Sequence, residues 1–178
     1  MGALRRRAAR WLIVAAAFGT AAAVVAFHEV LTDDPPDVGS AGGGAVVSRV
    51  VDGDTLRVTV DGRDVTVRLL GVDAPEMPDG CGAKEATAAL ETLLPVGTPV
   101  TLTVDPEADD MDRWGRWLRY LDVAGVDAAE SLSRAGLVGA WFPKGEPEPE
   151  RYPVYEAAVS AARSERVGSW AECPGLGR

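Results

Sequence analysis

The stretch that decides the fold is 68-RLLGVDAPE-76, in which an apolar strand ends in a loop that carries two carboxylates. Its two leucines and its valine are expected to lie in the core, because such side chains are the ones most often buried. Arg68 lies within the same apolar run, and Asp73 and Glu76 follow it three positions apart. One cation and two anions on a short loop either build a site or repel one another, so partners for these charges must come from elsewhere in the chain.

Strands are predicted on the N-terminal side of this loop. Residues 46–51 form an apolar run, and residues 55–60 alternate, with three apolar side chains on one face: Leu56, Val58 and Val60. Asp-Gly at 61–62 is a common hairpin turn, so residues 63–72 are expected to return as a third strand. The apolar residues of that strand share one face, and the two-residue period places Arg68 on the opposite face.

The remaining elements follow from helical periodicity, strand alternation and breaker residues. We expect helices at residues 83–94, 128–135 and 153–166, and further strands at 99–105, 117–123 and, as a short one, 137–142. Residues 106–114 and 145–150 are expected to be loops. Five strands followed by late helices predict an α+β fold, a small five-stranded Greek-key β-barrel with about three packed helices.

The first 45 residues are predicted to lie outside the folded domain. Residues 1–10 are basic and residues 11–27 carry no charge, which is typical of an export signal. The apolar run is short and rich in Ala, so a cleaved signal peptide and a retained single-pass anchor are both open, and a buried helix is a third possibility. We therefore assign four segments: a signal peptide or membrane anchor, 1–31; a flexible linker, 32–45; the folded domain, 46–173; and a tail, 174–178. The first two interpretations predict an extracytoplasmic protein, either secreted or tethered to the membrane.

Composition narrows the chemistry that the domain can perform. A formal net charge of -9 argues against a broadly basic nucleic-acid-binding face, although net charge does not decide what a local site binds. The sole histidine, His28, lies beside the N-terminal apolar run, which excludes Ser-His and Cys-His nucleophile systems and a structural zinc site. Any metal would be held by oxygen atoms, which points to Ca²⁺, Mg²⁺ or Mn²⁺.

Two cysteines, Cys81 and Cys173, flank the helical part of the domain. In an exported chain, an even number of cysteines predicts a disulfide. Closing a loop of this length would stabilise the fold by on the order of 4 to 5 kcal/mol in the chain-entropy description. The alternative is a pair of inert buried thiols.

Three short motifs together carry the residue types that phosphodiester hydrolysis needs. Asp54 of DGDT (52–55) and Asp73 would offer two carboxylates to a hard cation, and Arg116 of RWGR (113–116) adds a second cation beside a Gly turn. With Arg68 and Glu76 they suit a reaction in which negative charge builds on phosphoryl oxygens as water attacks.

Each motif also has a simpler interpretation. Asp-Gly-Asp occurs in many turns that bind nothing, and this one lacks the later ligands of an EF-hand loop. An ordinary Asx turn explains Asp73 equally well. A surface ion pair would explain Arg116, with a partner among the acids of the preceding loop: Asp109, Asp110 or Asp112.

Taken in order, VVDGDT (50–55), RLLGVDAPE (68–76), DRWGR (112–116) and GSWAEC (168–173) resemble the staphylococcal nuclease, or thermonuclease, family. The resemblance implies an OB-fold barrel with three helices and a Ca²⁺-dependent nuclease that acts on DNA and RNA. It implies three metal ligands, namely the carboxylates of Asp54 and Asp73 and the backbone carbonyl of Ala74, with Asp52 as an acid behind them. Glu76 matches the proposed general base, and Arg68 and Arg116 match the arginines that bind the phosphate.

The chain departs from the family pattern near the expected substrate. The loop at residues 77–82 is shorter and less basic than in the best-known members, and the tyrosines expected to flank the nucleotide are not evident near residue 142. Phe142 is a candidate to stack on a base in their place, and the alternative is that Trp141 and Phe142 are core residues. Lys84 and Arg113 are further candidates for substrate contacts.

We therefore expect a monomeric enzyme whose partners are DNA and/or RNA, with membrane contact through the N-terminal segment if that segment is retained. Intact Arg68, Glu76 and Arg116 favour catalysis, because a binding protein has no need of all three together. The alternatives are a non-catalytic extracytoplasmic OB-fold module that binds nucleic acid, and a Ca²⁺-stabilised interaction domain.

Overall fold

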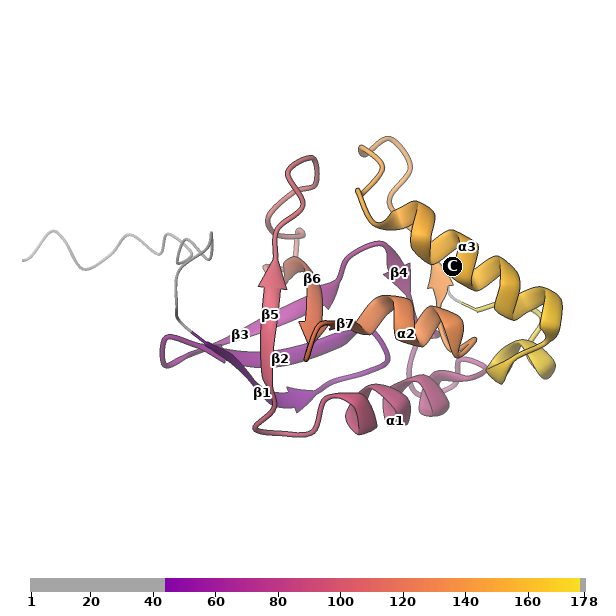
Figure 1. Cartoon of the computed structure of the whole chain (residues 1–178), viewed down its shortest axis with the longest axis horizontal. Helices are drawn as coiled ribbons and strands as arrows, with labels where there is room; N and C mark the ends of the chain where they lie inside the picture. The colour runs from indigo at the N-terminus through magenta and orange to yellow at the C-terminus, as the bar shows by residue number, and fades with distance from the viewer. Residues whose placement is uncertain (1–43, 177–178) are drawn as a thin grey trace, which may run out of the picture. The chain divides into compact units, whose positions relative to one another are not determined.

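Five of the strands between residues 45 and 123 close into a barrel. A computed structural model describes residues 44–176, so the predicted signal or anchor segment lies outside the described residues. Strands β1 (Ala45–Val50), β2 (Thr55–Val60) and β3 (Arg63–Leu69) form an antiparallel meander, and β5 (Pro99–Thr103) and β6 (Trp117–Val123) continue the sheet from the β1 edge (Figure 1). β3 then pairs in parallel with β6, from Val67↔Trp117 to Leu69↔Arg119, and this pairing closes the sheet. The predicted five-stranded OB-fold barrel of α+β class is confirmed.

The barrel interior is filled by the alternating residues that the sequence places on one face. Leu56, Val58 and Val60 of β2 are almost completely buried, as are Val67 and Leu69 of β3. Burying each such side chain contributes roughly 1.5 to 3 kcal/mol. Arg68 lies between the last two residues, and its side chain points to the other surface of β3, as predicted.

The strand predicted at 63–72 is wrong in its extent. It stops at Leu69, and a turn at Leu70-Gly71 separates it from the two-residue strand β4 (Val72–Asp73). Gly71 has a φ of 83°, and a Cβ there would lie 3.0 Å from the ring of Tyr155, so both the backbone and the packing favour glycine. The turn redirects Asp73 out of the barrel sheet, toward the site described below.

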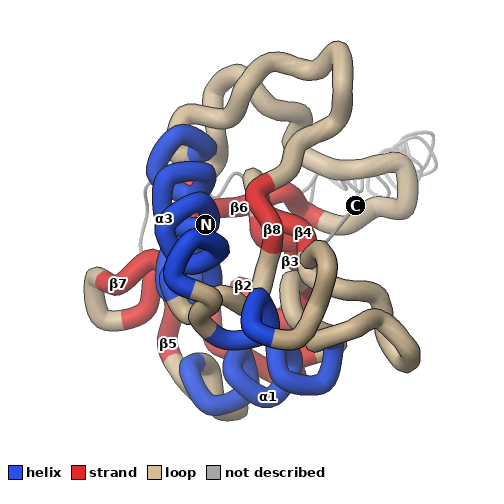
Figure 2. Tube along the Cα trace, turned by 90° about the vertical axis from the view of Figure 1, so that its right-hand side faces the viewer, coloured by secondary structure: helices blue, strands red, loops and turns tan. Residues whose placement is uncertain are grey.

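Two other strand predictions also differ from the structure. The strand expected at 137–142 is reduced to β8 (Gly139–Ala140), which pairs with β4 (Figure 2). The strand expected at 99–105 ends at Thr103. A short strand that the sequence did not predict, β7 (Val126–Asp127), pairs with the end of β6.

The three predicted helices are confirmed, with shifted ends: α1 (Ala83–Leu93), α2 (Ala128–Arg134) and α3 (Tyr152–Glu165). In α1, Ala83, Ala86 and Leu90 face the core at helical spacing. The carboxylate of Asp127 caps α2 by accepting a hydrogen bond from the backbone N–H of Glu130 at 2.9 Å. Within residues 44–176, none of the helices is long and apolar enough to cross a membrane.

The C-terminal segment returns to the barrel after α3. A 3₁₀ helix, η2 (Gly168–Ala171), follows α3, and the predicted disulfide between Cys81 and Cys173 is present. Leu176 is buried, so ordered packing continues beyond the second cysteine.

A buried carboxylate holds the two long loops that project from one side of the barrel (Figure 1). Asp105 follows β5, and its Oδ2 accepts hydrogen bonds from the hydroxyl of Tyr120 and from the backbone N–H of Glu150 at 2.7 Å. Its Oδ1 accepts from the backbone N–H of Glu107 at 2.8 Å. Burial alone would raise the pKa of Asp105, but these hydrogen bonds outweigh it and hold the pKa below its usual value.

We expect Asp105→Asn to destabilise the domain by about 1 to 3 kcal/mol, because it removes a charged acceptor from buried donors. The pKa of Asp105 is lower in the folded than in the unfolded state, so its contribution is present above pH ~4 and is lost as the pH falls through the folded pKa. In urea unfolding, the gap between wild type and variant should therefore shrink below pH ~4. Glu107→Ala, an exposed neighbour, is the control; a gap that does not narrow at all as the pH falls below ~4 would contradict the assignment.

Candidate active site

The DGDT turn is pressed against α1 and the β4 loop, which places Asp54 in the interior. A Cβ at Gly53 would lie 2.6 Å from the Cβ of Ala86 and 2.7 Å from that of Ala74, so only glycine fits there. Asp54 Oδ2 accepts a hydrogen bond from the backbone N–H of Ala74 at 2.8 Å. Its Oδ1 accepts from the hydroxyl of Thr55 at 2.9 Å. These contacts fix the orientation of the Asp54 carboxylate and tie the start of β2 to the residue after β4.

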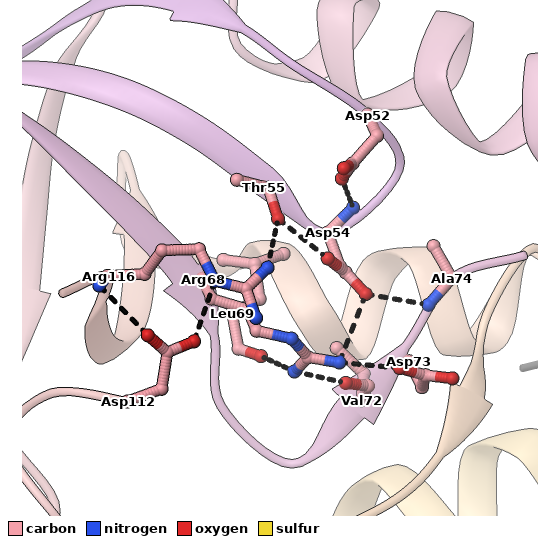
Figure 3. Close-up of polar contacts among 10 residues, drawn as sticks. All are labelled: Asp52, Asp54, Thr55, Arg68, Leu69, Val72, Asp73, Ala74, Asp112 and Arg116. Carbon is pink, nitrogen blue, oxygen red and sulfur yellow. Dashed lines mark hydrogen bonds and ion pairs between the residues drawn. The ribbon is translucent and has the colours of Figure 1, made fainter. Parts of the chain in front are cut away.

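Arg68 lies between the two buried aspartates (Figure 3). Its Nη2 is 2.5 Å from Asp73 Oδ1 and 3.3 Å from Asp54 Oδ2. Its Nη1 donates to the backbone carbonyls of Leu69 at 3.1 Å and Val72 at 2.9 Å, across the turn that ends β3. The arginine and the two aspartates are all buried, and their electrostatic interaction is strong because the surroundings exclude water.

Asp52 adds a third carboxylate beside this group. Burial raises the pKa of Asp52, and the neighbouring charge of Asp54 raises it further, against hydrogen bonds that lower it. Asp52 Oδ1 accepts a hydrogen bond from the backbone N–H of Asp54 at 3.1 Å, which makes this turn an Asx turn. The same turn contains both acidic residues. A carboxylate whose ionisation is disfavoured by burial and by a neighbouring acid marks a place where additional positive charge would be stabilised.

A small cavity of about 30 Å³ opens at this group of acids. Its walls include the four carboxylates and two guanidiniums that the sequence singled out: Asp52, Asp54, Asp73, Glu76, Arg68 and Arg116. Oxygens of Asp54 and Asp73 converge on Nη2 of Arg68, at 3.3 and 2.5 Å, so a cation would lie beside this nitrogen. Within residues 44–176, no three acidic, Cys or His side chains are grouped as a metal site; the oxygens on offer to a cation beside Arg68 are carboxylate oxygens. Hard divalent cations accept such oxygen ligands, and the donor set fits Ca²⁺.

Arg116 approaches the cavity from the loop before β6. Its Nε donates to Asp112 Oδ2 at 2.7 Å, and its Nη1 makes a long hydrogen bond of 3.4 Å to the hydroxyl of Thr55. The ion pair with Asp112 agrees with the interpretation of Arg116 as a residue that pairs with a loop acid. The guanidinium of Arg116 nevertheless also lines the carboxylate cavity. Burial raises the pKa of Asp112, but hydrogen bonds from the backbone and side chain of Arg116 and from the backbone of Trp114 bring it below its usual value.

A second cavity, of about 440 Å³, also borders the two arginines. Arg68 and Arg116 line it together with three aromatic side chains: Trp114, Trp141 and Phe142. Trp141 lies with its ring centroid 5.7 Å from the guanidinium carbon of Arg68. Trp114 is exposed, and its ring lies 4.0 Å from the guanidinium carbon of Arg113 and 5.2 Å from that of Arg116. The two cavities therefore meet at the arginine pair.

The predicted substrate residues divide between this cavity and the outer surface. Arg113 and Phe142 line the larger cavity, and Phe142 also packs edge-on against Tyr152 with centroids 4.8 Å apart. Lys84 is exposed on α1 and lines neither cavity. Sequence reasoning did not select Trp114 or Thr55, although an aromatic residue between two arginines at a Gly turn is itself a signal for cation–π contact.

Comparison with known proteins adds independent support. Residues 66–172 match the SNase family model, described as "Staphylococcal nuclease homologue". The chain belongs to the staphylococcal nuclease homologue family. The matched range contains Arg68, Asp73, Glu76 and Arg116 and begins after Asp54.

Among its relatives, the chain is 31% identical to the SPbeta prophage-derived endonuclease YokF of Bacillus subtilis (strain 168), over 71% of this chain and 43% of YokF. It is 30% identical to the thermonuclease of Staphylococcus intermedius, over 70% of this chain and 74% of that protein. It is 32% identical to the endonuclease YhcR of Bacillus subtilis (strain 168), over 71% of this chain but only 11% of YhcR. The chain thus spans less than half of YokF and about a tenth of YhcR.

We expect Ca²⁺ to raise the melting temperature of the full chain by on the order of 5 °C at a hundredfold excess over its Kd, because it binds only the folded state. Asp54→Asn and Asp73→Asn should each abolish this increase, measured within each variant with and without the cation. Asp64→Asn, whose exposed carboxylate pairs with Arg57, should retain it. An unchanged increase in both site variants would show that the cation binds elsewhere.

Proposed function

We propose that this chain is a metal-dependent nuclease that hydrolyses phosphodiester bonds of DNA and/or RNA. One observation supports the proposal above the others: Arg68 and Arg116 line both the carboxylate cavity and the aromatic cavity. A phosphate held between them would have acids on one side and a base-sized apolar cavity on the other. Homology to thermonucleases and endonucleases supports the same reaction class.

The metal that this donor set fits is Ca²⁺, held by Asp54, Asp73 and the backbone carbonyl of Ala74, with Asp52 behind them. When bound, such an ion acts as a Lewis acid that polarises the phosphoryl group. The buried hydrogen bonds to Asp54 keep its carboxylate in place for that task. Asp73 is held by its position in β4, whose partner strand is β8.

The protein side chains supply the remaining steps. Glu76 accepts the proton of a water molecule as that water attacks the phosphorus atom and the ester bond to the leaving oxygen breaks. Arg68 and Arg116 donate hydrogen bonds to the phosphoryl oxygens, on which negative charge increases in the transition state. Both guanidiniums are held by acids and by backbone or hydroxyl oxygens, so they need little reorganisation during the reaction.

The aromatic cavity is the proposed binding place for the nucleoside next to the scissile phosphate. Its volume is in the range of small-molecule sites, and stacking on an aromatic ring tolerates any base. Trp141 and Phe142 form one wall and Trp114 belongs to the opposite loop, with Arg113 beside it. This assignment extends the sequence prediction for Phe142 to the two tryptophans.

We also propose an extracytoplasmic location, secreted or tethered through the N-terminal apolar segment. The disulfide supports it, because such bonds persist in oxidising compartments. We expect the protein to act as a monomer.

The reaction is tested with Glu76→Gln and Arg116→Ala acting on single-stranded DNA in the presence of Ca²⁺. Each change should lower kcat by about 100-fold or more, because each removes a group that acts in the transition state. Arg134→Ala, on the exposed face of α2, should leave kcat unchanged. A chelator should abolish cleavage by the wild type.

Full, chelator-insensitive cleavage by both variants would exclude this mechanism. Tight binding of the DNA with no cleavage by the wild type would instead identify a non-catalytic nucleic-acid-binding module. Stabilisation by Ca²⁺ with neither binding nor cleavage would point to an interaction domain.

The base-binding role of the aromatic cavity predicts a different kinetic signature. Trp141→Ala should raise KM by about tenfold, since stacking on one base contributes about 1 to 3 kcal/mol, with a smaller change in kcat. Val96→Ala, which shortens an exposed apolar side chain outside both cavities, is the control. A KM unchanged by Trp141→Ala would contradict the stacking role.

A further inference from the structure

The loop that carries Glu76 has little packing of its own. Residues 76–79 are all exposed, and the side chain of Met77 makes no contribution to the core. A hydrogen bond of 2.8 Å from the backbone N–H of Gly80 to the carbonyl of Glu76 closes a tight turn. A Cβ at Gly80 would lie 2.6 Å from that carbonyl oxygen, so the turn needs glycine. Exposed loops of this kind have low local stability, and their position depends on how their two ends are anchored.

The two ends of this loop are anchored in different ways. At the N-terminal end Ala74 and Pro75 are buried, and the backbone N–H of Ala74 donates to Asp54. At the C-terminal end, Cys81 is bonded to Cys173, which lies 92 residues later in the chain. Gly82 follows, with a φ of 85°, and a Cβ there would lie 2.6 Å from the hydroxyl oxygen of Ser169 in η2. The second anchor is therefore made by the segment that follows α3.

Residues 168–176, here termed the C-terminal strap, also reach the segment that carries Asp73. The carbonyl oxygen of Leu176 is so close to Gly139 that a Cβ there would lie 2.4 Å from it. Gly139 is the strand partner of Asp73 in the β4–β8 pair. The strap thus contacts the partner strand of one proposed metal ligand and is covalently joined to the loop of the proposed general base.

We propose that the disulfide between Cys81 and Cys173 is a positioning element of the active site, which sets the place of Glu76 and makes full turnover depend on an oxidising environment. The inference rests on the proposed nuclease function. Neither cysteine lines the two cavities, so the disulfide acts through the loop rather than on the substrate. Misplacement of a catalytic group by about 1 Å is enough to cost about 100-fold in rate.

Reduction by a dithiol would release this anchor, and we expect the barrel to stay folded at temperatures below the lowered melting point, because its core cluster contains neither cysteine. Cys81 is the exposed partner and Cys173 the buried one, so a reductant thiolate attacks the Cys81 sulfur and displaces the sulfur of Cys173. The second thiol of the reductant then resolves the mixed disulfide. The protein disulfide takes up two electrons and two protons to give two thiols, and the dithiol is oxidised to its own disulfide. The burial of Ala74 and Pro75 holds the other end of the loop in both states.

A double-mutant cycle separates positioning from general stability. The full chain is prepared as wild type, as the Cys81→Ser/Cys173→Ser variant, as Glu76→Gln, and with all three changes. With Glu76 present, loss of the disulfide should lower kcat about tenfold or more with KM within about twofold. In the Glu76→Gln background the same loss should change kcat by less than twofold, because the group to be positioned is already absent. Dithiol treatment of the wild type should reproduce the effect, and reoxidation should reverse it.

Amide hydrogen exchange without substrate gives a readout that does not depend on activity. Residues 76–82 should exchange about tenfold faster after reduction, while β2 stays protected. Val60→Ala, at the far end of β2, is the control for lost stability: it should lower the melting temperature and leave kcat below that temperature unchanged. Equal loss of kcat in the two backgrounds, or unchanged exchange of 76–82, would overturn the proposal. An oxidised wild type with no nuclease activity would refute the proposed function. Amide hydrogen exchange of residues 76–82 would still test whether the disulfide anchors the loop.

Discussion

The arginine buried between two aspartates is the interaction on which the rest of this structure depends. Arg68 contacts Asp54 from the start of β2, Asp73 in β4, and two backbone carbonyls of the turn between β3 and β4. Burying one cation with two anions is favourable only when each group is well paired, because removing an ion from water is costly. The folded state therefore requires that the three charges meet, because leaving any one of them buried without a partner would be strongly destabilising. The pairing also leaves an excess of negative charge, which suits the binding of a cation beside it.

Both cavities follow from this arrangement. The turn at Gly71 brings Asp73 round to Arg68, and the pairing of β4 with β8 carries the next residues, including Trp141, to the other side of the arginine. Arg116 comes from a separate loop and reaches the same place through Asp112 and Thr55. The arginines thus contact acids in one cavity and aromatic rings in the other. In such an arrangement a phosphodiester could be bound by its phosphate and its base at the same time.

Local sequence predicted much of this fold because its strands and helices are strongly periodic. The alternation of residues 55–60 identified a barrel strand and its buried face, and the charges of RLLGVDAPE, DGDT and DRWGR identified the residues that line the small cavity. The end of β3 was harder to predict, since Leu70 and Val72 continue the apolar pattern and the turn depends on packing against Tyr155. The network of Asp105 was not predicted either. Its partner Glu150 lies 45 residues away, and the acids around both residues resemble ordinary solvated loop charges.

Because the chain is acidic overall, it can bind a polyanionic substrate only if a few cationic side chains attract that substrate at the site itself. A net charge of -9 repels a long nucleic acid, but at about 0.1 M salt this repulsion is largely screened at separations beyond about 10 Å. Arg68 and Arg116 act at shorter range and in surroundings from which water is largely excluded, where charge–charge interactions are stronger. Few other cations line the cavities, so binding would neutralise few phosphates and depend only weakly on salt. Such a site derives its affinity from one phosphate and one base rather than from the length of the polymer.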